Sequence, residues 1–204
     1  MNHAIYSTRI PIVLASGSPR RRDFLQALGI EFRIEPSLAE EPAPQNKETP
    51  ERYAMRMARI KGEEVAARFP DAAVIAADTV VALGEVILGK PADQADALRM
   101  LQMLRGQTHQ VVTGCCLFLP EGTTQSFAAS TDVRMRQTSD AELLAYAATG
   151  EPMDKAGAYA IQGIGAFLVE HVHGSYTNVV GLPLARLVVI LLERGVILSR
   201  EHTR

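Results

Sequence analysis

Apolar and polar positions follow two periods along the chain, and together they predict a mixture of strands and helices. Residues 11–15 are almost continuously apolar, which predicts a buried strand. Ser18-Pro19 has the chemistry of a helix start, and apolar positions at helical spacing continue to Gly29, a typical helix end. The chain therefore opens with a strand, a turn and a helix over 19–28.

The same two patterns continue to the end of the chain. A short strand is predicted at 31–35, and Thr49-Pro50 begins a long helix that reaches about Arg68. Strands and helices mix without strict alternation, so we expect an α/β fold with a mixed central sheet flanked by helices. The other predicted elements are strands at 72–83, 85–88, 109–119, 124–135 and 167–174, and helices at 92–105, 140–148 and 183–194.

Two connecting segments add to this picture. Residues 120–122, Pro-Glu-Gly, are a turn signal between the strands at 109–119 and 124–135, so those strands are expected to form an antiparallel hairpin. Residues 150–167, "GEPMDKAGAYAIQGIGAF", are rich in glycine, but apolar residues are interleaved throughout. This segment is therefore predicted to be an ordered loop rather than a linker.

Length and composition fit one globular domain over 1–204, with short tails at about 1–9 and 197–204. The chain has 204 residues, of which 47% are hydrophobic and 22% charged. Its core is therefore large enough for the chain to fold without disulfide bonds or a structural metal. The formal net charge of −2 argues against a generally basic surface and a direct nucleic-acid partner. Lysines and arginines therefore carry information only where they cluster locally.

The cysteines and the apolar runs bear on where the protein works. Cys115 and Cys116 are adjacent, so they can form neither an ordinary structural disulfide nor a four-ligand zinc site. No secretory signal is expected, and the most apolar stretch, 182–195, is interrupted by Arg186. We therefore expect a cytoplasmic protein with no transmembrane segment and no membrane partner.

The stretch "ASGSPRRR", residues 15–22, places arginines in the first turn of the first predicted helix. Arginines there oppose the helix dipole at a cost of roughly 0.3 kcal/mol or more each, unless an anion binds beside them. Free backbone N–H groups, hydroxyls and guanidinium groups are together the parts of a polyphosphate cradle. The alternative is a helix capped by Ser18, with Arg20 and Arg21 solvated.

Acidic residues in two places are candidates for a metal site or a general base. Asp78 lies in "AADT", at the end of a run of alanine and branched residues, where open α/β sheets place their ligand sites. Its carboxylate could hold a divalent cation or take a proton from water, or it could only start a turn. Glu40 and Glu41 follow the second predicted strand and are either further ligands or solvated loop acids.

Two further patterns give weaker signals. Residues 84–91, "GEVILGKP", fit a P-loop except at the last position, where Pro91 replaces the Ser or Thr that would bind magnesium. We therefore reject a P-loop enzyme and keep Lys90 as a candidate phosphate-binding charge. His171 and His173 would share one face of a strand, but no third histidine is near in sequence, so metal binding there is not expected.

Six stretches across the chain form one set: "ASGSPRRR", "AADTVV", "LGKP", "MLQMLRGQTHQVVTG", "EPMDKAGAYAIQG" and "GSYTNVVGLPL". In this order and at about this spacing they resemble the Maf family of nucleoside triphosphate pyrophosphatases, from about residue 11 to 194. The resemblance implies two lobes around a cleft, similar to inosine triphosphate pyrophosphatases. It also implies hydrolysis of a nucleoside triphosphate to the monophosphate and pyrophosphate with a divalent cation, Mg²⁺ first and Mn²⁺ or Co²⁺ as alternatives.

The resemblance also assigns roles to individual residues. Asp78 would be the catalytic residue and would bind the metal together with Glu40. Arg20, Thr79 and Gln162 match the specificity positions of the family's dTTP/UTP branch. The residues assigned to substrate binding are Ser16, Ser18, Arg20, Arg21, Lys61, Thr79, Lys90 and Gln162.

The expected activity is that of an enzyme that removes dTTP, UTP and modified pyrimidine triphosphates from the nucleotide pool. Gln162 offers a donor and an acceptor, which suits the imide edge of thymine or uracil. Two alternatives are a 7-methyl-GTP pyrophosphatase and a non-catalytic nucleotide-binding regulator of cell division. The resemblance further implies a homodimer, and the apolar helix at 183–194 could be either interface or core.

Overall fold

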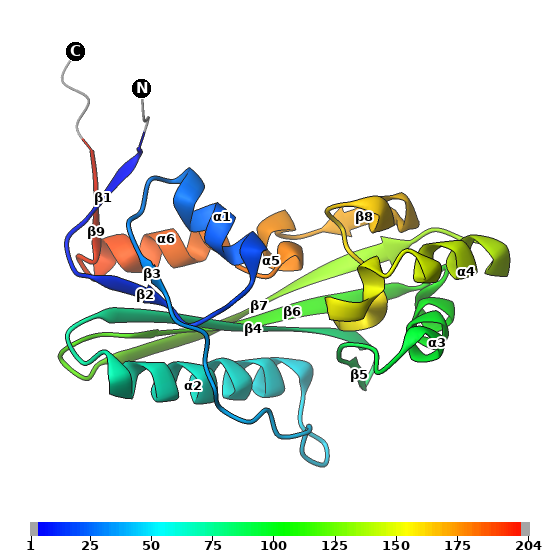
Figure 1. Ribbon diagram of the computed structural model, residues 1–204, viewed down its shortest axis with the longest axis horizontal. Helices are drawn as coiled ribbons and strands as arrows, with labels where there is room; N and C mark the ends of the chain where they lie inside the picture. Colours follow the sequence, from blue (N-terminus) through cyan, green and yellow to red (C-terminus); the bar gives the residue numbers. More distant parts are fainter. Residues whose placement is uncertain (1–3, 201–204) are drawn as a thin grey trace.

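A seven-stranded mixed sheet forms the centre of the molecule (Figure 1). The computed structural model describes residues 4–200. The strands are β2 (Ile12–Leu14), β3 (Arg33–Ile34), β4 (Ala73–Leu83), β5 (Val86–Leu88), β6 (Thr108–Phe118), β7 (Thr124–Met135) and β8 (Val169–His173). Their order is β3-β2-β4-β6-β7-β8, with β5 paired to the end of β4. β3, β2 and β4 are parallel and the other pairs are antiparallel, which confirms the predicted mixed sheet.

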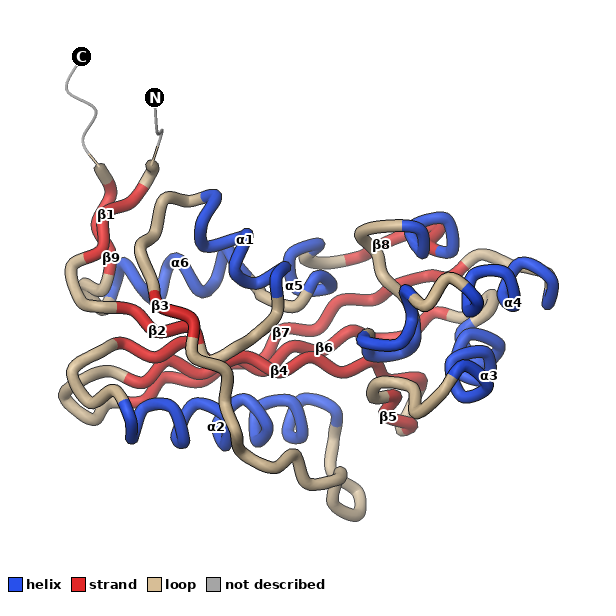
Figure 2. The backbone as a smooth tube through the Cα atoms, viewed as in Figure 1, coloured by secondary structure: helices blue, strands red, loops and turns tan. Residues whose placement is uncertain are grey.

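Helices cover both faces of this sheet (Figure 2). They are α1 (Pro19–Ala27), α2 (Pro50–Arg68), α3 (Gln94–Leu104), α4 (Asp140–Ala148), α5 (Tyr176–Val180) and α6 (Leu184–Glu193). α2 runs along one face, and α1 and α6 lie on the other (Figure 1). The glycine-rich segment contains three short 3₁₀ helices, η1 (Glu151–Asp154), η2 (Ala156–Ala158) and η3 (Ile164–Leu168).

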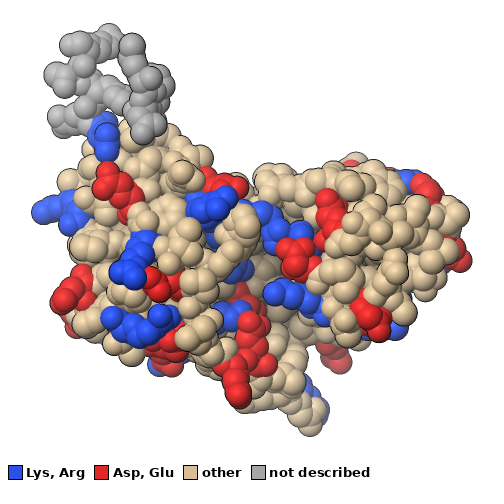
Figure 3. All heavy atoms as spheres, in the orientation of Figure 1, with Lys and Arg blue, Asp and Glu red and all other residues tan. Residues whose placement is uncertain are grey.

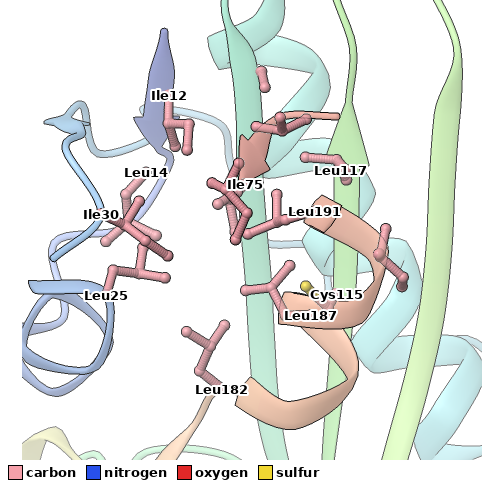
Figure 4. Close-up of a cluster of buried hydrophobic side chains, with 14 of the residues drawn as sticks. Ile12, Leu14, Leu25, Ile30, Ile75, Cys115, Leu117, Leu182, Leu187 and Leu191 are labelled. Atoms are coloured by element: carbon pink, nitrogen blue, oxygen red, sulfur yellow. The ribbon is translucent and has the colours of Figure 1, made fainter. Parts of the chain in front are cut away.

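Alternate residues of β4 pack against opposite layers of helices. Ala73, Ile75 and Ala77 belong to a buried cluster with side chains of α1 and α6, part of which is drawn in Figure 4. Val74 and Ala76 belong to a cluster with side chains of α2. This alternation follows from the two-residue period of a strand. Because both of its faces are buried, the first half of β4 is a continuous apolar run in the sequence.

Glycines let α2 lie close against the sheet. A Cβ added at Gly114 of β6 would lie 2.4 Å from the backbone carbonyl of Ala54 in α2. One added at Gly62 of α2 would lie 2.1 Å from the ring of Phe118. Neither position has room for a side chain, so these contacts fix the distance between α2 and the strands. That distance matters because α2 carries Lys61.

Several short elements lie outside the predicted pattern. β1 (Tyr6–Thr8) and β9 (Ile197–Ser199) form an antiparallel pair near the chain ends (Figure 1). Both fall in the stretches predicted as tails, and three residues are too few for a pattern to identify a strand. The five-residue α5 was missed for the same reason. Within residues 4–200, no helix combines the length and apolar character needed to span a bilayer.

The edge of β4 is open over residues 76–80. β2 pairs with residues 73–75 of β4, and β5 pairs on the same side with residues 81–83. Between them, β4 is paired only to β6 on its other side, within the part of the chain that the structure describes. One lobe lies beside β2, and a second buried cluster, formed largely by α3, α4 and their neighbours, lies beyond β5. The gap therefore falls between the two lobes.

Candidate active site

A cleft of about 630 Å³ opens at this gap in the edge of β4. Its walls come from the turn before α1, from α2 and β4, and from the segment 154–162. Basic and acidic side chains gather in the hollow between the lobes (Figure 3). The residues predicted for the site that line the cleft are Ser16, Ser18, Arg20, Arg21, Lys61, Asp78, Thr79, Lys90 and Gln162.

The turn before α1 leaves the first backbone N–H groups of the helix without a capping side chain. Ser18 stands at the N-cap position, but its side chain makes no capping hydrogen bond, and Pro19 follows at the first helical position. The first turn contains no acidic residue. The Ser16 hydroxyl accepts a hydrogen bond from the Ser18 N–H at 3.3 Å. The helix end is thus free to bind an anion, and the capping alternative does not hold.

The guanidinium group of Arg21 is largely engaged by the protein itself. Nε donates to the Gly181 carbonyl at 2.7 Å, and Nη1 donates to the Ala77 carbonyl at 2.8 Å and the Ser16 hydroxyl at 3.0 Å. Nη2 donates to the Thr79 hydroxyl at 3.0 Å. Burial lowers the pKa of Arg21. These bonds tie α1 to β4 and to the end of α5, so most donors of Arg21 hold the cleft wall together.

Arg20, one residue earlier, faces the mouth of the cleft. Its side chain is 30% exposed, and Nη1 lies 3.9 Å from Oδ2 of Asp154. Asp154 also pairs with Lys155, whose side chain lines the cleft and is 14% exposed. Asp154 is therefore the counterion of two cleft cations in this structure. A bound triphosphate could replace it as their partner.

Asp78 is buried at the open edge of β4, next to Lys61 of α2. Lys61 Nζ lies 2.7 Å from Oδ1 of Asp78 and 2.9 Å from Oε1 of Glu41. Burial alone would lower the pKa of Lys61, but the two carboxylates outweigh burial and raise it. Lys61 is therefore a fixed positive charge between two acids.

Glu41 reaches the cleft and Glu40 does not. Glu40, which the sequence analysis paired with Asp78, is exposed and lies outside the cleft lining, whereas Glu41 is part of it. Asp78 and Glu41 both approach one ammonium nitrogen, so their oxygens converge. Two carboxylates completed by substrate phosphates are a ligand set that Mg²⁺ accepts. Residues 4–200 contain no group of three or more His, Cys, Asp or Glu placed to bind a metal, so a cation here would need such additional ligands.

The hydroxyl of Thr79 belongs to a chain of hydrogen bonds beneath the cleft. It lies 2.9 Å from the Thr113 hydroxyl, which donates to the Asn178 carbonyl at 3.1 Å. Since the Thr113 hydroxyl has one proton, Thr79 donates to Thr113 and accepts from Arg21. This chain connects the central sheet to α5.

Lys90 and Gln162 stand on the side of the cleft formed by the second lobe. Lys90 follows β5, and Gln162 lies between η2 and η3. Both residues are exposed while lining the cleft, so their side chains are available to a ligand. His171 and His173 are exposed on β8 and do not line the cleft.

Three buried titratable groups near the cleft are unsuited to proton transfer or nucleophilic attack. Nε2 of His109 lies 2.8 Å from the hydroxyl of Tyr159, and burial lowers the pKa of His109 to about 4. Burial raises the pKa of Cys115 to about 12 and also raises the pKa of Cys116. At neutral pH the imidazole is thus uncharged and the thiols are protonated. Neither thiol is therefore available as a nucleophile.

Comparison with known proteins places the chain in a family. A sequence profile described as "Maf-like protein" matches residues 11–194. The chain belongs to the Maf family. A protein from Nitratidesulfovibrio vulgaris named dTTP/UTP pyrophosphatase is 54% identical over 187 residues, covering 92% of this chain and 89% of that protein. A protein of the same name from Deinococcus radiodurans is 47% identical, covering 91% of this chain and 93% of its own length.

The fold of this chain is similar to that of proteins with solved structures. A HAM1 protein from Coxiella burnetii has a TM-score of 0.53 at 16% sequence identity, and the match covers 91% of this chain and 100% of that chain. The likeness shows a shared fold. It agrees with the two-lobed α/β architecture expected from the sequence.

Sequence reasoning on this Maf protein missed the adjacent charged residues Asp154 and Lys155 of the cleft. Lys155 lies in the quoted stretch "EPMDKAGAYAIQG", and its place beside Asp154 in an ordered loop is a signal that could have been used. Glu41 was weighed as a ligand, but Glu40 was preferred for the metal site. In an irregular loop no period tells which of two adjacent side chains faces inward, so only the structure distinguishes them.

Proposed function

We propose that this Maf protein hydrolyses dTTP and UTP to the monophosphate and pyrophosphate. The observation that carries the proposal is a buried carboxylate, Asp78, bound to Lys61 at 2.7 Å in a cleft that is also lined by an uncapped helix end. The names of the relatives at 54% and 47% identity support the same reaction and the same substrates. Removal of surplus or modified pyrimidine triphosphates would be its role in the cell.

Asp78 has the chemistry and the setting of the group that activates water. Lys61 donates to Oδ1, and no residue within 4–200 donates to Oδ2, which is left to accept a hydrogen bond from water. The water oxygen attacks the α-phosphorus, the bond from that phosphorus to the bridging oxygen breaks, and Asp78 takes the proton. Pyrophosphate departs with the bridging oxygen. Arg20, Lys61 and Lys90 offset the charge that develops on it.

A divalent cation fits this site, and we propose Mg²⁺. Asp78 and Glu41 would hold it, since their oxygens converge at Lys61 Nζ. When bound, the cation would supply neutralising charge to the triphosphate. Orientation of the water and acceptance of its proton stay with Asp78.

The reaction is tested by incubating the purified protein with a panel of canonical and modified nucleoside triphosphates and Mg²⁺. Release of pyrophosphate, with one monophosphate formed per pyrophosphate, is expected for dTTP and UTP. Release of orthophosphate instead would mean cleavage at another bond. Binding without turnover of any nucleotide would favour the regulator over the enzyme.

Arg20→Ala and Lys90→Ala are expected to raise KM, to lower kcat, or both. Each side chain offers a positive charge at the cleft mouth to a group whose charge distribution changes during the reaction. Arg99→Ala is a matched control, because Arg99 is exposed on α3, where it pairs with Asp96. Steady-state kinetics with UTP distinguish the outcomes. Unchanged kcat and KM in both cleft variants would show that Arg20 and Lys90 are solvated surface charges with no part in the reaction.

We further propose that the protein is a cytoplasmic homodimer. Both cysteines are free and buried, which suits a reducing compartment. The apolar side chain of Val189 on α6 is 52% exposed, which supports a role for α6 in the interface. Light scattering on the purified chain measures the oligomeric state directly.

A further inference from the structure

The segment that carries Gln162 is held from behind by Glu151 of η1 and Tyr146 of α4. Oε1 of Glu151 accepts from the Ile164 N–H at 2.9 Å, and Oε2 accepts from the Gly165 N–H at 2.8 Å. The Tyr146 hydroxyl donates to Oε2 of Glu151 at 2.8 Å and accepts from the Ala160 N–H at 3.1 Å. One carboxylate and one phenol thus bind the backbone on both sides of Gln162.

The loop backbone is shaped to fit this pair. Gly163 has φ 115°, and a Cβ added there would lie 2.3 Å from Oε1 of Glu151. A Cβ added at Gly165 would lie 2.4 Å from the Tyr146 hydroxyl oxygen. Any side chain at either position would displace the bonding groups, so the two glycines allow the close approach that the hydrogen bonds require.

The protonation states of the two groups suit these bonds. Burial alone would raise the pKa of Glu151, but the N–H groups of Gly165 and Ile164 and the hydroxyl of Tyr146 outweigh burial and lower it. Burial and the acceptor on Glu151 raise the pKa of Tyr146. At neutral pH the carboxylate accepts and the phenol donates. The Tyr146 ring is further fixed by an edge contact with Phe167, at 5.9 Å between ring centroids.

Neither Glu151 nor Tyr146 lines the cleft, so their effect on a ligand has to pass through the loop. Ala160 and Ile164, whose N–H groups they hold, stand two residues before and after Gln162. The side chain of Gln162 is exposed and has no hydrogen bond to any other residue within 4–200. Its direction therefore depends on the backbone on either side of it.

We propose that Glu151 and Tyr146 are positioning residues that set the base preference of the enzyme by fixing the backbone of residues 160–165 around Gln162. The proposal rests on the function proposed above, in which Gln162 meets the imide edge of the base. Neither residue touches substrate, and neither takes part in the cleavage at Asp78. Loss of the pair should therefore relax selectivity while the chemical step continues.

The test compares Glu151→Gln and Tyr146→Phe with the parent protein. Phenylalanine removes the donor and acceptor of Tyr146 with little change in shape, and glutamine keeps the size of Glu151 while turning one acceptor oxygen into a donor. Glu170→Gln is the matched control, because Glu170 is exposed on β8 just after η3 and, among the described residues, forms an ion pair only with Arg134. Two readouts are taken, kcat/KM for UTP against CTP and hydrogen exchange of the amides in residues 160–165.

Both variants are expected to exchange faster at residues 160–165 than the parent and the control. Their preference for UTP over CTP is expected to fall by roughly 3- to 10-fold, the size of one hydrogen bond's contribution, with kcat for UTP within about threefold of the parent. Faster exchange with an unchanged preference would overturn the proposal and leave the pair a purely structural role. Unchanged exchange would overturn it as well.

A different experimental result would overturn the proposed function itself. A parent protein that hydrolyses neither UTP nor CTP would overturn the function, whatever the variants do. The preference is then measured as the ratio of the Kd values for the two nucleotides by calorimetry. A ratio that falls in both variants, together with faster exchange, would still support the positioning role.

Discussion

Asp78→Asn is expected to lower kcat by about two to four orders of magnitude while the protein stays folded. The amide of asparagine cannot take the proton from water and is a weak ligand for a cation. Asparagine does keep the size of aspartate and a side-chain oxygen. That neutral oxygen can still accept the hydrogen bond that Lys61 Nζ donates to Asp78 Oδ1 at 2.7 Å. Pyrophosphate release measures the loss, and the thermal midpoint together with circular dichroism measures folding.

Asp71→Asn is the matched control for this change. Asp71 is exposed in the turn just before β4, so the same loss of charge is placed close in sequence but outside the cleft. Its kcat should equal that of the parent. A near-normal kcat in Asp78→Asn would remove Asp78 from the mechanism, and an unfolded variant would show that the Asp78–Lys61 pair is needed for folding.

The parent protein is expected to prefer UTP and dTTP over CTP by roughly 10- to 100-fold in kcat/KM. The imide edge of uracil or thymine offers carbonyl oxygens and an N–H, whereas cytosine has a 4-amino group and an unprotonated N3. Gln162 has both a donor and an acceptor, and its exposed side chain lines the cleft. Gln162→Glu should reduce the preference, because a carboxylate cannot donate to a carbonyl oxygen.

Gln26→Glu is the matched control for base selection, since Gln26 is exposed on α1 and does not line the cleft. Its preference should match the parent's. Equal kcat/KM for UTP and CTP in the parent would rule out base selection by Gln162. The cleavage chemistry proposed for Asp78 would be unaffected by that result.

The regular parts of the fold could be predicted because burial repeats with a fixed period. The helix predicted from Thr49-Pro50 to about Arg68 is α2, and the strand predicted at 72–83 is β4 within one residue. Thr49 caps α2 by accepting from the Arg52 N–H at 3.3 Å, as its position suggested. Capping residues and the spacing of apolar residues are local features, so they can be recognised from a single sequence.

The site was harder to predict because its geometry depends on contacts between distant segments. The sequence placed Arg20 and Arg21 together in a cradle, but the carbonyl of Gly181, 160 residues away, engages Arg21. Adjacent residues of a helix point about 100° apart, so one faces the mouth of the cleft while the other turns into the wall. Nothing within residues 15–22 indicates which of the two does so. The same limit explains the choice between Glu40 and Glu41.

The open edge of β4 also bears on how this protein avoids aggregation. Unpaired backbone groups over residues 76–80 are a place where a strand from another molecule could add to the sheet. Arg21 donates a hydrogen bond to the Ala77 carbonyl in this gap. The charged side chains of Arg20 and Lys61 line the same cleft. A charged ligand could enter there, but an apolar strand would have to bury those cations. We therefore expect the groups proposed to bind a triphosphate also to hinder pairing of the sheet with another chain.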